Sequence, residues 1–415
     1  MKNPKIVIVG CGIVGALMAY ELSHQFPQAD VVVLERSQPA QGSTGAALGV
    51  LMGVISGRVK GRTWRLREAS IRRYHTLMPE LAAQGHPVPC NQQGIVSLCY
   101  DEAKLPRWET LKEKRHAQGW PLEIWSPEQL KDRCPHIELL TPTKNSPDTA
   151  QLVEAQSVKA AIYSPADRQV QPVPLTRTLI EIAQARGVSF HWEHEVTELL
   201  MQGTLCTGVQ TSRGTFDADW LILTAGLGSA ALSKFSNEPL ALIPVLGQAM
   251  EIQLPAPLGN PTFQPVINGH DIQCVPLGEG RYWIGATVEF PPKPSSLEPS
   301  SSELSSSELS SSELSSPAPW TTNSDTFKAQ ADGLANLRQG AESFISAFAQ
   351  ATVLKTWSGL RPRPVGQPAP VIKPLGDTKN VTLATGHYRN GVLLAPATAQ
   401  QVCKQLSETL FSTVS

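Results

Sequence analysis

The sequence predicts an α/β fold in two parts, a parallel sheet flanked by helices and a second, mainly antiparallel β-sheet part of α+β character. Two short runs rich in β-branched residues, 5–9 and 31–34, are typical of strands buried on both faces of a parallel sheet. Residues 240–290 instead alternate apolar and polar side chains, as antiparallel strands with one solvated face do. Because 415 residues exceed what one hydrophobic core usually serves, the length predicts two domains or one elaborated domain.

The N-terminal strand opens a complete βαβ unit. Residues 5–9 lead directly into the turn sequence GCGIVG, residues 16–26 have the apolar pattern of a helix, and residues 31–34 form the second strand. A basic start with an apolar run is also typical of a signal peptide. The regularly spaced glycines and the amphipathic segment after them favour the strand, turn and helix.

Three glycines of this turn, Gly10, Gly12 and Gly15, match the pattern Gly-x-Gly-x-x-Gly, and Glu35 closes the next strand 20 residues after Gly15. They allow, in order, a tight turn, close approach of the backbone to a pyrophosphate, and close packing of helix on strand. The helix N-terminus offers unpaired N–H groups to the phosphates. A carboxylate at Glu35 suits ribose hydroxyls and repels a 2′-phosphate, which favours FAD or NAD over NADP. The alternative is a glycine-rich packing turn beside a solvated glutamate.

The remaining elements follow the same periodicities. Residues 95–100 and 220–223 are predicted strands, and the second of these leads into the small residues 224–226. Further helices are predicted over residues 62–81, 172–186, 334–348 and 392–410.

These elements predict a chain that leaves its first domain and returns to it. We expect a discontinuous nucleotide-binding domain of residues 1–85, 155–235 and 351–415. The second domain is expected to comprise residues 86–154 and 236–350. An NAD enzyme would normally keep its nucleotide domain in one piece, so the late return of the chain favours FAD.

A low-complexity tract interrupts the second domain. The pentapeptide SSSEL recurs over residues 300–314 between groups of prolines. Such a polar tract cannot bury enough apolar surface to offset the entropy of ordering it. We therefore expect a disordered insertion at about residues 291–326.

The composition excludes several classes of protein. With 35 Lys and Arg against 36 Asp and Glu, the net charge of −1 argues against a general nucleic-acid-binding domain. The 7 cysteines include no Cys-x-x-Cys pair and no cluster with histidine, so we expect no metal site and no disulfide framework. A reducing compartment, the cytoplasm, fits this best. No uninterrupted apolar run of about 20 residues predicts a membrane span.

Several segments together resemble the D-amino-acid oxidase superfamily, and within it the thiamine-pathway glycine oxidases. The resemblance covers the chain apart from about residues 291–326. Its most specific segments are the two nearest the C-terminus, at 357–362 and 386–396. The segments are GCGIVG with Glu35, STGAA at 43–47, TAG at 224–226, PVLGQ at 244–248, GATVE at 285–289, WSGLRP at 357–362 and GHYRNGVLLAP at 386–396.

The resemblance implies a Rossmann-type domain that holds FAD noncovalently and a substrate domain that covers the flavin. It implies oxidation of a small primary or secondary amino acid, with a hydride leaving Cα–H for flavin N5, an imine that hydrolyses to a 2-oxo acid, and oxygen reduced to hydrogen peroxide. The residues that it implies at FAD are Gly10, Gly12, Ile13, Val14, Gly15, Glu35, Arg36, Ser43, Thr44, Gly45, Ala46, Ala47, Val196, Ala225, Gly226, Gly386, His387, Arg389, Asn390, Gly391, Val392 and Leu393.

The C-terminal segment makes physical sense in that role. Gly386 and Gly391 permit the backbone to approach a flat ligand, and the helix from Val392 would direct partial positive charge at the flavin C2 carbonyl and N1. A plain packing helix is the alternative. His387 could be proposed as a base, but a lone histidine beside a cofactor loop is more often a hydrogen-bonded structural residue.

Arg361 is the candidate substrate anchor. It lies in a segment with few other charges, and such an arginine usually has an anionic partner, either a substrate or a structural carboxylate. In the resembled family the matching arginine binds the substrate carboxylate, and the one matching Arg389 lies beside the same pocket. Where family members commonly place a tyrosine, this chain has Gln273, which donates a hydrogen bond but changes the shape and polarity of the pocket.

A basic run leaves a different class of function open. The run is opposed only by Glu68, and flavin-dependent tRNA-modifying relatives exist in the superfamily, so phosphate contacts are conceivable. We favour a solvated helix face or a contact between subunits of a homo-oligomer, because few aromatic residues interleave with the charges. Within enzymes, the alternative is a D-amino-acid dehydrogenase or a secondary-amine oxidase with another electron acceptor. The basic residues are Arg58, Lys60, Arg62, Arg65, Arg67, Arg72 and Arg73.

Overall fold

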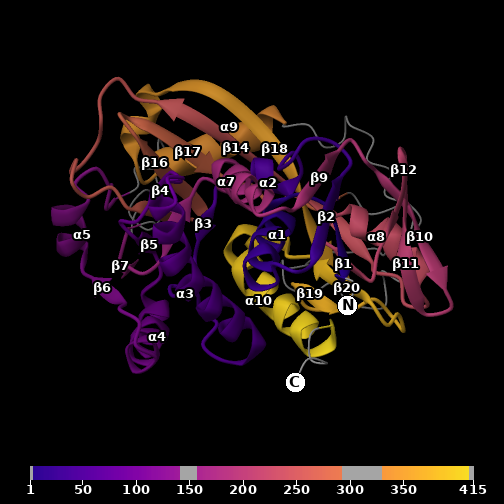
Figure 1. The fold of residues 1–415 in the computed structure, drawn as a ribbon. Helices are drawn as coiled ribbons and strands as arrows, with labels where there is room; N and C mark the ends of the chain where they lie inside the picture. The colour runs from indigo at the N-terminus through magenta and orange to yellow at the C-terminus, as the bar shows by residue number, and fades with distance from the viewer. Residues whose placement is uncertain (1–2, 141–156, 292–329, 411–415) are drawn as a thin grey trace, which may run out of the picture.

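The computed structural model describes residues 3–140, 157–291 and 330–410, and these form four sheets with helices around them (Figure 1). The insertion predicted at about residues 291–326 lies outside the described residues, apart from residue 291. The mixed α/β architecture with a parallel sheet and a second, largely antiparallel sheet confirms the predicted fold class.

A six-stranded sheet carries the N-terminal βαβ unit, in the order β19-β20-β13-β1-β2-β9. The strands from β20 to β9 are parallel, and β19 runs antiparallel to β20 at the edge. Ile6 and Ile8 on one face of β1 are fully buried, and Val7 on the other face is nearly so, as a strand between two layers requires. The strands are β1 Lys5–Val9, β2 Asp30–Glu35, β9 Ser189–Trp192, β13 Trp220–Leu223, β19 Val371–Pro374 and β20 Val381–Thr385.

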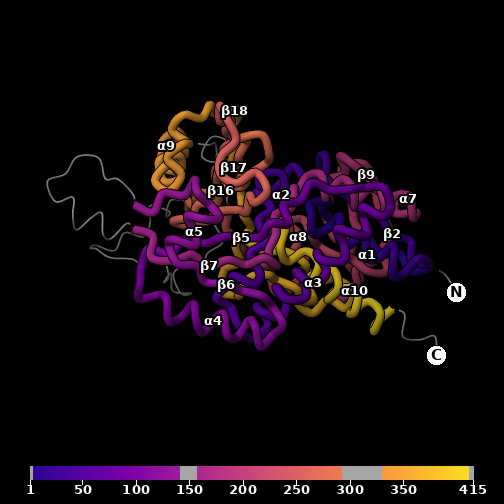
Figure 2. The backbone as a smooth tube through the Cα atoms, turned by 90° about the vertical axis from the view of Figure 1, so that its left-hand side faces the viewer, coloured from indigo at the N-terminus to yellow at the C-terminus, as the bar shows by residue number. Residues whose placement is uncertain are grey.

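Helices pack in layers against this sheet. Helix α1, Ile13–Gln25, is apolar almost all round because it lies between the sheet and two further helices, α7, Pro172–Ala185, and α10, Gly391–Leu410. The long helix α3, Gly61–Ala83, packs against α10, and Figure 2 shows these two helices side by side. The first and last parts of the chain therefore share one core.

The parallel strands determine where the connecting turns gather. Gly10 follows β1, Ala225 follows β13, and Gly386 follows β20, and these three strands are neighbours in the sheet. Because the carboxyl ends of parallel strands meet at one edge, three segments far apart in the sequence converge there.

The second main sheet has eight strands in the order β18-β14-β17-β16-β15-β5-β7-β6. Its pairs are antiparallel except for β15 with β5. Strands β7 and β18 fall inside the ranges predicted for the nucleotide-binding domain, yet they pair in this sheet, because β7 pairs with β5 and β18 with β14. The strands are β5 Ile95–Cys99, β6 Glu123–Trp125, β7 Ala160–Ser164, β14 Leu242–Gln253, β15 Val266–Gly269, β16 Ile272–Gly278, β17 Arg281–Gly285 and β18 Thr352–Pro364.

One predicted helix is shorter than its apolar stripe. Helix α9, Ala331–Glu342, ends six residues before Phe348, and a separate 3-10 turn covers Ser346–Gln350. Phe344 and Phe348 are nevertheless buried in the core beside the eight-stranded sheet. Tertiary packing thus buries these apolar residues without a continuous helix. For this reason the apolar period overestimated the length of the helix.

The smaller elements complete the described chain. A three-stranded antiparallel sheet, β10-β11-β12, packs beside the six-stranded sheet, and a second one, β3-β8-β4, contacts α10 through β3. These elements are β3 Val50–Leu51, β4 Cys90–Asn91, β8 Arg168–Val170, β10 Val196–Gln202, β11 Leu205–Thr211, β12 Gly214–Asp217, α2 Ser43–Ala46, α4 Leu105–Ala117, α5 Pro127–Arg133, α8 Gly228–Leu232 and α9 Ala331–Glu342.

Three further observations concern disulfide bonds, metal ions and membranes. All seven cysteines are free thiols. Within the described ranges, no group of three or more His, Cys, Asp or Glu side chains is arranged to hold a metal ion. No helix in those same ranges is long and apolar enough to cross a membrane.

Candidate functional site

A cavity of about 2450 Å³ begins at the convergence of β1, β13 and β20 and continues along the eight-stranded sheet. Its walls include the turn after β1, the segment after β20, and the inner face of β18. The volume exceeds the roughly 300–1,000 Å³ of ordinary small-molecule sites, so the cavity is large enough for a dinucleotide with a substrate beside it.

The glycine turn after β1 brings backbone segments very close together beside this cavity. Gly10 has φ +98°, and a Cβ there would lie 2.7 Å from Ala225 Cα. A Cβ on Gly15 would lie 2.0 Å from the carbonyl oxygen of Gly10, so a side chain at Gly15 would force α1 away from β1. Only glycine permits both approaches.

The N-terminus of α1 faces the cavity at Ile13 and Val14. The Ile13 N–H donates to Thr44 Oγ1 at 3.0 Å, which holds the 43–47 segment beside the turn. The first turn of α1 carries no acidic side chain. Its partial positive charge is therefore not neutralised by a nearby carboxylate of its own helix, as an anion-binding helix end requires.

Glu35 also lines the cavity, and it organises the turn as well as facing a ligand. Its Oε2 accepts from the Cys11 N–H at 2.7 Å, and its Oε1 accepts from the Ser37 N–H at 3.2 Å. The Ser37 hydroxyl also donates to Oε1 at 3.4 Å. A carboxylate has about four acceptor positions, so one of them stays open for a hydroxyl donor.

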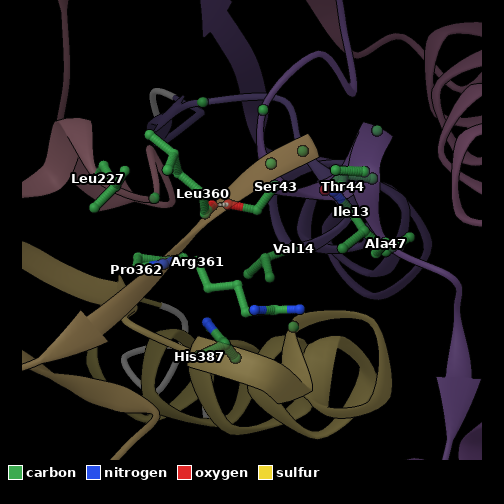
Figure 3. A pocket seen from close by; sticks show the side chains of 18 of the residues that line it. Ile13, Val14, Ser43, Thr44, Ala47, Leu227, Leu360, Arg361, Pro362 and His387 are labelled. Carbon is green, nitrogen blue, oxygen red and sulfur yellow. Dashed lines mark hydrogen bonds between the residues drawn. The ribbon is translucent and has the colours of Figure 1, made fainter. Parts of the chain in front are cut away.

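The 43–47 segment joins the turn to the second sheet. The Ser43 hydroxyl donates to the Leu360 carbonyl at 2.6 Å, and the Trp357 indole N–H donates to the Ala46 carbonyl at 3.1 Å. Figure 3 shows Thr44 beside Ile13 and the bond from Ser43 to Leu360. Helix α2 thus links the glycine turn after β1, which we call the dinucleotide turn, to β18.

The segment after β20 closes the other side. The Thr385 hydroxyl donates to the Gly226 carbonyl at 3.1 Å, which joins the turns after β20 and β13. Gly386 has φ +64°, a conformation that favours glycine.

His387 is held by hydrogen bonds inside the protein. Its Nε2 lies 2.9 Å from the Thr398 hydroxyl, which itself donates to the Leu394 carbonyl at 2.8 Å. Because that hydroxyl has a single proton, Nε2 of His387 is the donor in their shared bond. Burial, with Arg62 nearby, lowers the pKa of His387 to about 4, so the ring is neutral near pH 7.

Arg361 stands opposite Val245 in the β14–β18 ladder and lines the cavity. Its Nη1 donates to the backbone carbonyls of Leu246 at 3.1 Å and Thr287 at 2.9 Å. No carboxylate of the described residues lies within ion-pair distance of it, while burial and the nearby charge of Arg389 lower its pKa. Figure 3 shows the side chain pointing from β18 toward the segment that carries His387.

The predicted site residues converge. Every residue predicted to bind FAD or substrate, including Arg36, Val196, Gln273 and Arg389, lines this cavity, with the exception of Gly15, which packs between helix and strand. Gln273 donates from Nε2 to the Met52 sulfur at 3.3 Å.

Sequence reasoning missed several lining residues. Arg67 was grouped with a solvated basic run, and Met52 and Trp283 carried no motif. The one available signal was Trp357 inside WSGLRP, because its ring meets that of Trp283 edge-on with centroids 5.9 Å apart.

The basic run does not form one solvated face. Arg73 pairs with Glu21 at 2.7 Å and with Glu80 at 2.8 Å, Arg72 pairs with Glu68 at 2.8 Å, and Arg67 faces the cavity. These partners leave fewer cations for phosphate contacts than the sequence alone indicates.

The residues fit a bound FAD. The glycine turn is a cradle that side chains would fill, the helix end beside it carries no acidic side chain in its first turn, and the cavity is of matching size. Together, a Rossmann-type turn, a discontinuous set of cavity walls and a second sheet bearing an unpaired arginine define a dinucleotide-dependent oxidoreductase of the two-sheet flavoprotein class.

Comparison with known proteins identifies the family. The family model described as DAO, FAD dependent oxidoreductase, matches residues 5–405, and the chain belongs to this family of FAD-dependent oxidoreductases. The chain is 25% identical to "Glycine oxidase" of Geobacillus kaustophilus over 413 residues, which cover 98% of this chain and 94% of that protein.

Two further comparisons agree. The chain is 27% identical to "Bifunctional protein ThiO/ThiG" of Synechocystis over 398 residues, which cover 95% of this chain and 50% of that protein. The crystal structure of the Geobacillus kaustophilus glycine oxidase superposes with a TM-score of 0.77 at 22% identity and covers 98% of this chain and 95% of that one. The two sheets are therefore arranged as in that enzyme.

Proposed function

We propose that this protein oxidises a small amino acid, with glycine, sarcosine or a small D-amino acid as the substrate class, and that oxygen is the electron acceptor. The observation that carries the proposal is Arg361. Its half-buried guanidinium donates, among the described residues, only to backbone carbonyls, and it lines the cavity that holds the dinucleotide turn. Such a guanidinium retains donors for a carboxylate and loses its uncompensated charge when one binds.

The chain's own groups contribute positioning. Two backbone carbonyls fix the Arg361 guanidinium, so a carboxylate bound there presents its Cα–H in a restricted set of orientations. Gln273 and Arg389 line the same cavity and would add donors. Noncovalently bound FAD, held by the glycine turn and the 43–47 segment, supplies the two-electron redox chemistry.

The state of His387 favours loss of a hydride from a substrate whose amine is already neutral. His387 is neutral near pH 7, but its Nε2 proton is donated to Thr398 and the residue is buried. It is thus a positioning residue for the C-terminal helix. The amine proton leaves to solvent, and the imine product hydrolyses to a 2-oxo acid and ammonia or an amine.

Anaerobic bleaching of the holoenzyme tests the proposal. Purified yellow protein is mixed without oxygen with glycine, sarcosine, D-alanine and L-alanine, and the flavin absorbance is followed. We expect bleaching by at least one of the first three, and hydrogen peroxide when air is admitted. Bleaching without peroxide would indicate a dehydrogenase with another acceptor. No bleaching by any amino acid would overturn the proposal.

A further inference from the structure

A second arginine without an ionic partner faces the same cavity. Arg67 of α3 donates from Nη1 to the Met52 carbonyl at 2.5 Å and from Nη2 to the Asn390 side-chain oxygen at 3.1 Å. Both partners are neutral. The Nε atom is buried and has no hydrogen-bond partner among the described residues. Such a buried donor is costly unless a ligand or water satisfies it.

Other arginines of the same helix are paired. Arg72 lies 2.8 Å from Glu68 and Arg73 lies 2.7 Å from Glu21. The negative charge of Asp167 raises the pKa of Arg67, but Asp167 does not pair with it directly. The Asp167 carboxylate instead accepts from three backbone N–H groups of residues 53–55. Arg67 is therefore a half-buried cation with a buried Nε and no direct counter-ion among the described residues, and desolvation lowers its pKa.

The position of Arg67 places it next to the expected substrate. Met52 contacts it through the carbonyl and contacts Gln273 through the sulfur. Its other partner, Asn390, directly follows Arg389. Arg361 bonds to different carbonyls, those of Leu246 and Thr287, so the two unpaired guanidinium groups are held by separate parts of the cavity wall.

We infer that Arg67 binds a second anionic group of the substrate, and that the preferred substrate is a small amino acid with two carboxylates, such as an N-carboxymethyl amino acid or an acidic D-amino acid. The inference rests on the proposed function and makes its substrate class more specific. One carboxylate pairs with Arg361 and the other with Arg67. A substrate with a single carboxylate would leave the Arg67 guanidinium, whose Nε is buried, without a counter-ion, which is unfavourable.

Equilibrium binding tests this without turnover. The holoenzyme is titrated with propionate and with succinate, and dissociation constants are read from the perturbed flavin absorbance. We expect succinate to bind at least tenfold more tightly than propionate. In Arg67→Met the succinate advantage should disappear, because one partner of the charge pair that produces it is removed. Arg67→Lys, which keeps the charge but not the fork of donors, should retain part of it.

Kinetics provide the second readout. Bleaching rates are compared for iminodiacetate against sarcosine and for D-aspartate against D-alanine, in wild type and in Arg67→Met. Arg65→Met is the matched control, because Arg65 is an exposed arginine two positions earlier on the same helix. We expect the preference for the dicarboxylic member of each pair to collapse in Arg67→Met and to persist in Arg65→Met.

The outcomes separate the two proposals. Equal loss for both members of each pair, or a wild type that prefers the monocarboxylic members, would overturn the role of Arg67 while leaving amino acid oxidation intact. Bleaching by no amino acid of either kind would remove the proposed function and this inference together. If Arg67→Met fails to retain flavin, the wild-type titration and the Arg67→Lys variant decide the question.

Discussion

Arg361 and His387 illustrate two fates of a charged or titratable side chain inside one cavity. Two backbone carbonyls accept hydrogen bonds from the Arg361 guanidinium, and no carboxylate of the described residues pairs with it. The protein therefore fixes the position of this cation without neutralising its charge, which a ligand can do. His387 is the reverse, since a hydroxyl accepts its proton and burial keeps the ring neutral.

Replacing Arg361 with lysine tests the anchor. A lysine keeps the positive charge but loses the planar pair of donors, so we expect KM for the amino acid to rise on the order of 10²-fold with a smaller change in kcat. Steady-state kinetics measure both constants. Arg363→Lys is the control, because Arg363 stacks on Phe290 and Tyr388 and does not line the cavity. Unchanged KM in Arg361→Lys would contradict the assignment.

His387 predicts a pH dependence of stability. Its pKa is about 4 in the folded protein against 6.5 ordinarily, so between these values the unfolded chain binds a proton that the folded chain does not. Stability is then complete above about pH 6.5 and falls as the pH decreases toward 4. From pH 7 to pH 5 this group alone should cost about 2 kcal/mol of unfolding free energy.

Urea denaturation at the two pH values measures this loss. His387→Gln keeps a side-chain N–H donor for Thr398 but does not titrate, so its stability should depend less on pH by that amount. His136, whose pKa burial also lowers to about 4, contributes to both proteins and cancels in the comparison. An identical pH slope in wild type and variant would refute the assignment to His387.

At the scale of elements, the loop after β3 is held from two sides. The Asp167 carboxylate accepts from the N–H groups of residues 53–55 at 2.7 to 2.8 Å. Arg115 of α4 is 0% exposed and donates to the carbonyls of Val54, Ser56 and Arg58. This clamp positions Met52 and Ser56 on the cavity wall.

Replacing Arg115 with methionine should release the loop. The guanidinium also stacks 3.5 Å over Trp64, and burial lowers its pKa to about 10. Its loss would leave the carbonyls of Val54, Ser56 and Arg58 without this donor, which should cost on the order of 3 kcal/mol of unfolding free energy. Chemical denaturation measures this, and Arg107→Met on the exposed face of the same helix serves as control. A loss below about 1 kcal/mol would show that the loop does not depend on this clamp.

Elements were predictable from the sequence wherever one period dominated. The βαβ unit and helices α3, α7 and α10 were predicted within a few residues, because each has a strong apolar period. The end of α9 and the pairing of β7 and β18 were not predictable, because they depend on partners far away in the sequence. Strand pairing is a tertiary choice that local pattern does not encode.

Across the whole molecule, the cavity joins segments from both ends of the chain. Its walls come from the turns after β1, β13 and β20 and from β14 and β18 of the other sheet. A ligand that bridges them therefore binds the folded state and has little affinity for the unfolded chain.

FAD removal is consequently expected to destabilise the entire protein. With free FAD at about 100 times its dissociation constant, the holoprotein should be about 2.7 kcal/mol more stable than the apoprotein. For a chain of this length, that is a rise in Tm on the order of 5 °C. Differential scanning calorimetry of apoprotein with increasing FAD measures it, with riboflavin as a control that lacks the pyrophosphate. A Tm independent of FAD would contradict a cofactor that spans both sheets.

The sequence by itself determined the dinucleotide turn and indicated Arg361 as the candidate anchor, because glycines at fixed spacing and an arginine in a segment with few other charges act through local backbone geometry and charge. Only the tertiary structure decided which members of the basic run are neutralised and which face the cavity. Arg67 and Arg73 lie six positions apart on one helix, yet one meets two neutral oxygens and the other two carboxylates. The physical reason is that counter-ions come from whichever elements pack alongside, and this packing is fixed only when the chain closes on itself.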